Sequence, residues 1–273
     1  MKLSARMTAS AALLIILAST VGCTKLKARD ELVKGVQAFK SGKYEEAVDY
    51  FQKSVALDPS DPMSQLYLAT AYSSQIVPDL TTPENLALAQ KALSGFDAVL
   101  AKNPNDLDAL RQEASINRNI HKFDQAKADE MKIISIDPRD AEANYTIGVI
   151  DWTQAYKKDI TILAAAGLQD DAKGNVKKSK AVCEQIVTAD SDQVNEAMKY
   201  LQQAININPT YDDAMQYLQL DYRTKADMEC GDDAARKTDL ATADDWVQKA
   251  MGARKANEIA KEKIAAHGGV TPQ

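Results

Sequence analysis

The stretch AININPTYDDAMQYL, residues 204–218, places an Asn-Pro step between two apolar patterns of helical spacing. Nearly the same step recurs in VALDPSDPMSQLYL (55–68), LAKNPNDLDAL (100–110) and ISIDPRDAEANYTIGV (134–149). A proline disfavours helix at the residue before it, and the polar residue that follows suits the start of a new helix. Each step therefore predicts a sharp connection between two helices.

The spacing of these steps indicates an internal repeat. The four prolines, Pro59, Pro104, Pro138 and Pro209, are 45, 34 and 71 residues apart, which fits a 34-residue period with insertions of 11 and 37 residues. Counting back from each proline, position 20 is always alanine, and a fifth unit without the proline also has alanine there: Ala47, Ala92, Ala126, Ala197 and Ala243. Position 8 is small in four units, at Gly35, Ala69, Ala114 and Gly148, with Gln219 as the exception. Small residues on consecutive helices predict closely packed helix pairs.

These features resemble the tetratricopeptide repeat, an antiparallel helix pair with small residues at positions 8 and 20 and proline at 32. The best match is KGVQAFKSGKYEEAVDYFQKSVALDP, with Gly35, Tyr44, Ala47, Phe51 and Pro59. The resemblance implies an all-α, right-handed superhelical solenoid of about five helix pairs, helix A and helix B in each, with a C-terminal capping helix. The expected boundaries are 1–22 for a leader, 23–27 for a tether and 28–273 for a single domain, with units at 28–61, 62–106, 107–140, 141–211 and 212–257 and the cap running to 268.

The helix ends are predicted from the same steps. Helix B should stop at the Asp or Asn before each proline. The next helix A should be capped by Asp61, Asp106, Asp140 and, in the last unit, Thr210.

A third insertion, of about 12 residues around CGDDAARKTDLA, belongs to the fifth unit. All three insertions fall between helix A and helix B of their own units, so they are expected on one rim. The largest contains AYKKDITILAAA, a continuation of helix A to Gly167, and NVKKSKAVCEQIV, a short extra helix. Cys183 and Cys230 lie in successive insertions, so either a disulfide joins them or both stay free and partly buried.

The first 22 residues predict a secretory signal peptide, with Lys2 and Arg6 before a 15-residue apolar run that is too short to span a membrane. The residues Thr20-Val21-Gly22-Cys23 resemble the bacterial lipobox, although the family most often has leucine at the position of Thr20. The resemblance implies lipidation of Cys23 and a cell-envelope location, at the periplasmic face of the outer membrane. A soluble periplasmic protein is the alternative.

Composition and motifs argue against several function classes. The formal net charge is −6, without the concentrated basic face that nucleic acid binding requires. No phosphate-binding loop or calcium loop is present, and neither His121 nor His267 has metal ligands at suitable spacing. We therefore expect no enzymatic activity, no cofactor and no metal.

Protein recognition is the function that remains. In the repeat family, helix A lines a concave groove, and the corresponding positions here include Arg111, Arg118, Asn119, Tyr145, Trp152 and Arg223. Aromatic and arginine side chains are enriched at interface hot spots. The sequence predicts a membrane-anchored scaffold that binds a protein or peptide partner in the groove or along the insertion rim. The alternative is an envelope enzyme or small-ligand-binding protein with a pocket formed by the insertions.

Overall fold

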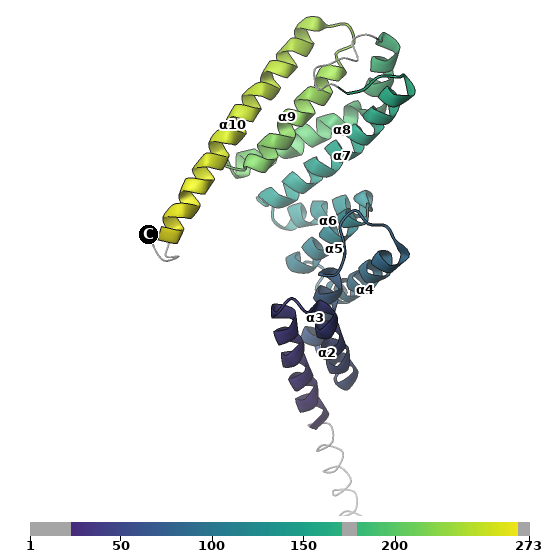
Figure 1. Cartoon of the computed structure of the whole chain (residues 1–273), viewed down its shortest axis with the longest axis vertical. Coiled ribbons are helices and arrows are strands. Elements are labelled where there is room, and N and C mark those ends of the chain that lie inside the picture. Colours follow the sequence, from purple (N-terminus) through teal and green to yellow (C-terminus); the bar gives the residue numbers. More distant parts are fainter. Residues whose placement is uncertain (1–22, 171–178, 267–273) are drawn as a thin grey trace, which may run out of the picture. The chain divides into compact units, whose positions relative to one another are not determined.

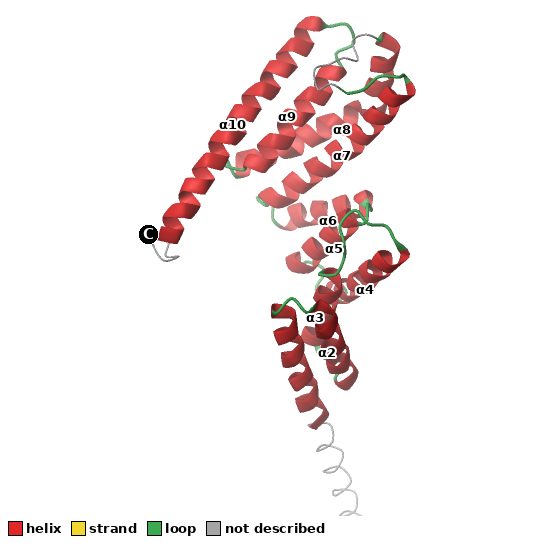
Figure 2. Ribbon diagram, in the orientation of Figure 1, coloured by secondary structure: helices red, strands yellow, loops and turns green. Residues whose placement is uncertain are grey.

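A computed structural model describes residues 23–170 and 179–266, and in these ranges every regular element is a helix (Figure 2). The predicted leader (1–22) and the predicted end of the cap at Gly268 lie outside the described residues. A first helix covers residues 23–40, and the expected tether at 23–27 forms the first turns of that helix. The other helices are α2 (Tyr44–Leu57), α3 (Pro62–Ser73), α4 (Pro83–Leu100), α5 (Leu107–Asn119), α6 (Phe123–Ile136), α7 (Ala141–Ala165), α8 (Lys180–Ile207), α9 (Asp212–Asp227) and α10 (Asp233–Ala266).

Each Asp/Asn-Pro step forms the same turn. The side-chain oxygen of the residue before proline accepts a hydrogen bond from the amide two residues later, at 3.2 Å for Asp58, 3.4 Å for Asn103, 3.0 Å for Asp137 and 3.1 Å for Asn208. The main-chain carbonyl of each also accepts from the amide three residues later, at 3.0–3.2 Å. An Asx side chain therefore closes the turn while the proline stops the helix. From the sequence, only the proline is expected to end the helix.

Three of the four predicted caps are confirmed. Asp61, Asp106 and Asp140 accept from main-chain amides in the first turns of α3, α5 and α7. The prediction for Thr210 is wrong, because Tyr211 occupies the cap position of α9 without a side-chain hydrogen bond. The Thr210 hydroxyl instead donates to Asn208 Oδ1 at 3.1 Å.

The chain divides into two units, where the sequence predicts one domain over 28–273. The first runs to Ala126 and the second from Lys127, so the boundary lies inside α6. In the first unit α2 packs on α3, α3 on α4, and α4 on α5. In the second, α7, α8, α9 and α10 lie side by side in chain order (Figure 1). The predicted class, an all-α stack of repeat helices, is confirmed.

The small residues lie at helix crossings. All five position-20 alanines, Ala47, Ala92, Ala126, Ala197 and Ala243, are completely buried. A Cβ atom added to Gly148 would lie 2.5 Å from Cγ of Leu201 and 3.2 Å from the carbonyl oxygen of Ala197. A Cβ atom on Gly35 would collide with the ring of Phe51 in the same way. A small residue at position 8 therefore makes room for a large residue at position 24 of the facing helix.

The insertions lie between helices A and B as predicted, but two details differ. The predicted extra helix in NVKKSKAVCEQIV begins outside the described residues, and its part from Lys180 onward is the start of α8, which continues without a break to Ile207. The predicted cap is likewise the second half of α10, a single helix of 34 residues. The helical spacing of apolar residues continues through both junctions, and neither junction contains a proline that would end the helix. Much of the large insertion therefore lengthens α7 and α8.

Candidate functional site

A continuous row of aromatic side chains crosses the second unit between α7 and α9. The row runs from Tyr211 to Tyr145, Tyr217, Trp152 and Tyr156, with successive ring centroids 4.9, 5.8, 5.2 and 5.1 Å apart. All five residues are partly exposed. Aromatic pairs at these distances stabilise each other by about 0.5–1.5 kcal/mol beyond their burial, so the row is a rigid surface. We call these five residues the aromatic row.

A cavity of about 270 Å³ lies at the Tyr156 end of the aromatic row. Its walls come from the extended part of α7, from α8 and α9, and from the loop after α7. They combine aromatic, aliphatic and charged side chains: Trp152, Tyr156, Asp159, Leu163, Asp170, Ile186, Leu220, Arg223, Thr224 and Asp227. The insertion that lengthens α7 thus supplies much of the cavity.

The acidic side chains of the cavity are unevenly solvated. Asp159 is only 5% exposed, and burial raises the pKa of its carboxyl to about 8, with the neighbouring carboxyl groups of Asp190, Asp227 and Asp170 acting in the same direction. Near neutral pH, Asp159 is therefore mostly protonated in the empty cavity. The neighbouring Asp190 carboxyl, on α8, accepts a hydrogen bond from Lys158 Nζ at 2.8 Å.

Arg223 and Tyr156 are two other polar side chains that line the cavity. Arg223 donates from Nη2 to Asp244 Oδ1 on α10 and from Nε to Gln219 Oε1, at 2.8 and 2.9 Å. Burial raises the pKa of the Tyr156 hydroxyl, and the neighbouring Asp170 carboxyl acts in the same direction. The two contacts of Arg223 restrain its side chain in the cavity wall.

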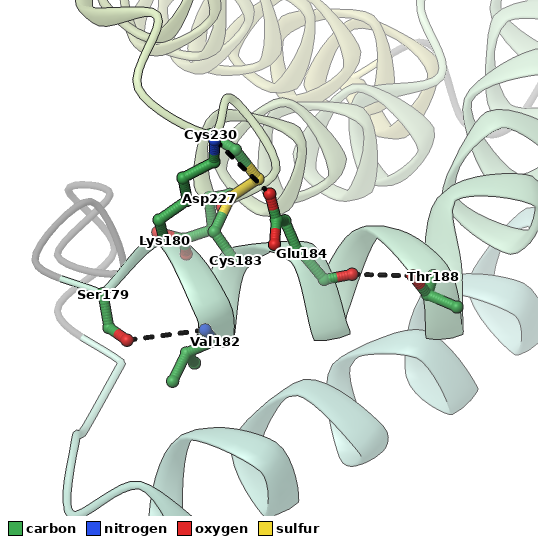
Figure 3. Close-up of a disulfide and its surroundings, with 8 residues drawn as sticks. All are labelled: Ser179, Lys180, Val182, Cys183, Glu184, Thr188, Asp227 and Cys230. Atoms are coloured by element: carbon green, nitrogen blue, oxygen red, sulfur yellow. Dashed lines mark hydrogen bonds and ion pairs between the residues drawn. A yellow bond between two sulfur atoms is a disulfide. The ribbon is translucent and has the colours of Figure 1, made fainter.

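A disulfide between Cys183 and Cys230 closes the neighbouring end of the unit (Figure 3). It joins the first turn of α8 to the α9–α10 loop, across a Cα–Cα distance of 5.6 Å. Sγ of Cys183 lies 3.2 Å from the main-chain oxygen of Asp227, a cavity residue. Leu163 and Ile186 belong both to the cavity wall and to the apolar cluster around Cys183. The sequence leaves open whether Cys183 and Cys230 form a disulfide or stay free, and the structure contains the disulfide.

Comparison with known proteins assigns the helix pairs to a family. The sequence matches the tetratricopeptide repeat at residues 33–61 and again at residues 190–211. The chain contains tetratricopeptide repeats. The first match covers the unit with the clearest sequence pattern, and the second contains the end of α8 and the Asn-Pro turn after it.

Solved structures of similar fold cover most of the chain. MamA from Desulfovibrio magneticus RS-1 is 19% identical, with a TM-score of 0.53, and the match covers 84% of this chain and 96% of that one. YrrB, described as a tetratricopeptide repeat protein with an unusual peptide-binding site, is 13% identical with a TM-score of 0.51, covering 87% and 97%. At these identities the likeness shows the fold.

Curated relatives match over shorter regions. RNA polymerase II-associated protein 3 from Homo sapiens is 25% identical over 158 residues, 55% of this chain. The matched regions span only 12–22% of the lengths of the curated relatives. This chain therefore matches only a small part of each curated relative.

The tetratricopeptide register places the predicted groove residues in both units. Three of them come together in the second unit: Tyr145 and Trp152 belong to the aromatic row, and Arg223 lines the cavity. Arg111 and Arg118 lie on α5 in the first unit, where Nη1 of Arg111 is 3.8 Å from Oδ1 of Asp108. Asn119 ends α5, and its main-chain oxygen accepts from the amide of Asp79 in the α3–α4 loop.

Several residues of the site were not predicted from the sequence. Tyr156, Asp159 and Asp170 lie in the insertion, where the 34-residue register gives no position, and Tyr217 falls outside the family's usual groove positions. A usable signal was present in WTQAYKKDITIL, because Trp152, Tyr156, Asp159 and Leu163 recur at intervals of three and four residues.

Residues 23–170 and 179–266 contain neither a metal-ligand cluster nor a membrane-spanning helix. No group of three or more histidine, cysteine, aspartate or glutamate side chains there has the geometry of a metal site. Of the helices in those ranges, none has the length and apolar character needed to cross a bilayer.

Proposed function

We propose that this protein is a cell-envelope scaffold whose second unit holds an extended segment of a partner protein along the aromatic row. The observation that carries the proposal is the row itself: five partly exposed rings in mutual contact, leading to a cavity at one end. Rigid aromatic side chains around a pocket are typical of protein-binding hot spots. The function is binding without catalysis.

The relatives support a peptide as the partner. YrrB, whose fold matches most of this chain, is a tetratricopeptide repeat protein with an unusual peptide-binding site. Within the first unit, Arg111 and Arg118 remain candidates for further contacts with the same partner. The cavity favours a second candidate function, the binding of a small ligand, because it encloses several converging polar side chains.

A crosslinking experiment tests the scaffold function. A photo-crosslinking amino acid at Tyr217 should capture a partner in cells, and mass spectrometry should map the crosslink to one segment. A synthetic peptide of that segment should bind the purified protein, and Trp152→Ala should weaken it at least about tenfold, as expected for a hot-spot residue.

The matched control is Tyr200→Ala, which removes a partly exposed tyrosine on α8 outside the aromatic row. It should leave peptide affinity within about twofold, since residues outside a hot spot contribute little. Equal losses for both variants, or crosslinks scattered over unrelated segments, would argue against the aromatic row as the binding surface.

The proposal includes a lipid anchor at Cys23, which is exposed and not disulfide-bonded in the structure. The Cys183–Cys230 disulfide supports export, because such bonds are typical of oxidising compartments. The mature N-terminus should begin at Cys23 and carry acyl chains, and Cys23→Ser should release the protein from membranes. Intact-mass analysis of the purified protein measures this directly. An unmodified mature chain that begins elsewhere would support the soluble alternative.

A further inference from the structure

In the cavity at the end of the aromatic row, a carboxyl oxygen and an indole N–H, polar groups of opposite kind, lack a hydrogen-bond partner in the described part of the chain. Oδ1 of Asp159 and Nε1 of Trp152 are both buried, and neither has a hydrogen-bond partner among the described residues. Asp159 and Trp152 both line the cavity. A buried polar group without a partner costs about 1–3 kcal/mol. A ligand that offers a donor to Asp159 and an acceptor to Trp152 would satisfy both.

The charge of the cavity favours a cationic donor. Its lining includes three carboxyl groups, on Asp159, Asp170 and Asp227, and one guanidinium, on Arg223. That guanidinium already donates to Asp244. The faces of Trp152 and Tyr156 also attract cations. An anionic ligand would meet repulsion from all three carboxyl groups when they are ionised.

The size and walls of the cavity favour one extended side chain. Its volume of about 270 Å³ lies just below the ~300–1,000 Å³ typical of sites for drug-sized ligands. Aliphatic surface from Leu163, Ile186 and Leu220 suits a methylene chain, with the charged end at the carboxyl groups.

We propose that the cavity binds a lysine side chain of the partner segment. Its ammonium group contacts Asp159 and Asp227, and its main-chain carbonyl accepts the hydrogen bond of Trp152 Nε1. This inference rests on the proposed function and deepens it, since the aromatic row supplies the path by which a peptide reaches the cavity. It gives the insertion in the α7–α8 hairpin a role in partner selection.

Binding should depend on pH in a defined direction. The charged groups around Asp159 are Asp170 in the following loop, Asp190 on α8, and Arg223 and Asp227 on α9, and Lys158 on α7 forms an ion pair with Asp190. In the empty cavity the pKa of Asp159 is about 8, so an ammonium group must displace its proton at lower pH. Affinity should therefore rise with pH up to about 8, by up to ~tenfold per unit, with release of up to about one proton at pH 7.

Isothermal titration calorimetry of the purified full chain tests this inference. The probe is N-acetyl-lysine N-methylamide, titrated at pH 6 and pH 8 and in two buffers of different ionisation enthalpy. The norleucine and glutamate analogues should bind at least about tenfold more weakly, because they lack the cation. Butylammonium should also bind more weakly than the lysine probe, since it has no carbonyl for Trp152. Equal binding of lysine and norleucine probes would overturn the proposal.

Two matched variants locate the effect. Asp159→Asn should weaken the lysine probe at least about tenfold at pH 8 and remove the proton release. Asp221→Asn alters another buried carboxyl of the same unit, on α9 outside the cavity, and should retain wild-type affinity. Circular dichroism should show both variants folded. Unchanged binding by Asp159→Asn would contradict the inference.

The failures of the two proposals are distinguishable. If the partner peptide binds and Trp152→Ala weakens it, but Asp159→Asn leaves its affinity unchanged, the scaffold function stands and the lysine inference is wrong. If butylammonium binds as tightly as the lysine probe and no partner segment is captured, the scaffold function fails and the cavity is a site for free amines.

Discussion

Replacing Cys183 and Cys230 together by serine should lower the free energy of unfolding of the second unit by about 4 kcal/mol. This is the entropic contribution to stability expected for a disulfide between residues 47 positions apart. The double variant avoids leaving a reactive thiol. Cys183 is also buried at 1% exposure among Leu163, Val182 and Ile186, so a serine hydroxyl there adds to the loss. Urea unfolding followed by circular dichroism measures the change.

The disulfide prediction has a functional consequence and a control. Because Cys183 contacts the main chain of Asp227, loss of the bond should also weaken the lysine probe. The control, Cys23→Ser in the chain prepared without its lipid, removes a cysteine that is exposed and not disulfide-bonded, so stability should stay within about 0.5 kcal/mol. A double variant as stable as wild type would show that α8 and the α9–α10 loop are held by other contacts.

Substituting alanine at two glycines should change stability in opposite directions. Gly148→Ala places a Cβ atom against Leu201 and the Ala197 carbonyl, so we expect a net loss of about 1–3 kcal/mol. At Gly252, in the exposed part of α10, an added Cβ would meet no described atom within 4 Å. Gly252→Ala should therefore gain about 0.5–1 kcal/mol from helix propensity. Denaturant unfolding of the two variants, measured side by side, gives both values. Losses of similar size at both sites would contradict the crossing argument.

Much of the fold was predictable from sequence because a repeat states the same constraint several times. The five position-20 alanines and four Asp/Asn-Pro turns each specify one helix crossing or one connection, and agreement among them identifies the register. The pairing of small position 8 with large position 24, as in Gly148 and Leu201, was not predicted. It depends on side-chain direction at the crossing, which a spacing count does not contain.

The candidate site was only partly predictable for a related reason. Tyr145 and Trp152 lie within the repeat register, so their helix face followed from position. Asp159 lies in the insertion, and its significance depends on burial against α8 and α9, which are distant in sequence. The disulfide likewise required a Cα separation that only the packed helices supply.

The direct test of the central claim, that a small residue at each crossing makes room for the large residue facing it, is a double-mutant cycle between Gly148→Ala and Leu201→Ala. Leu201→Ala alone should cost about 2–5 kcal/mol, since its side chain is completely buried. In that background the added methyl group at position 148 no longer meets Leu201, so Gly148→Ala should cost much less than in the wild type. The account predicts a compensating coupling energy of at least ~1 kcal/mol, and additivity within ~0.5 kcal/mol would contradict it.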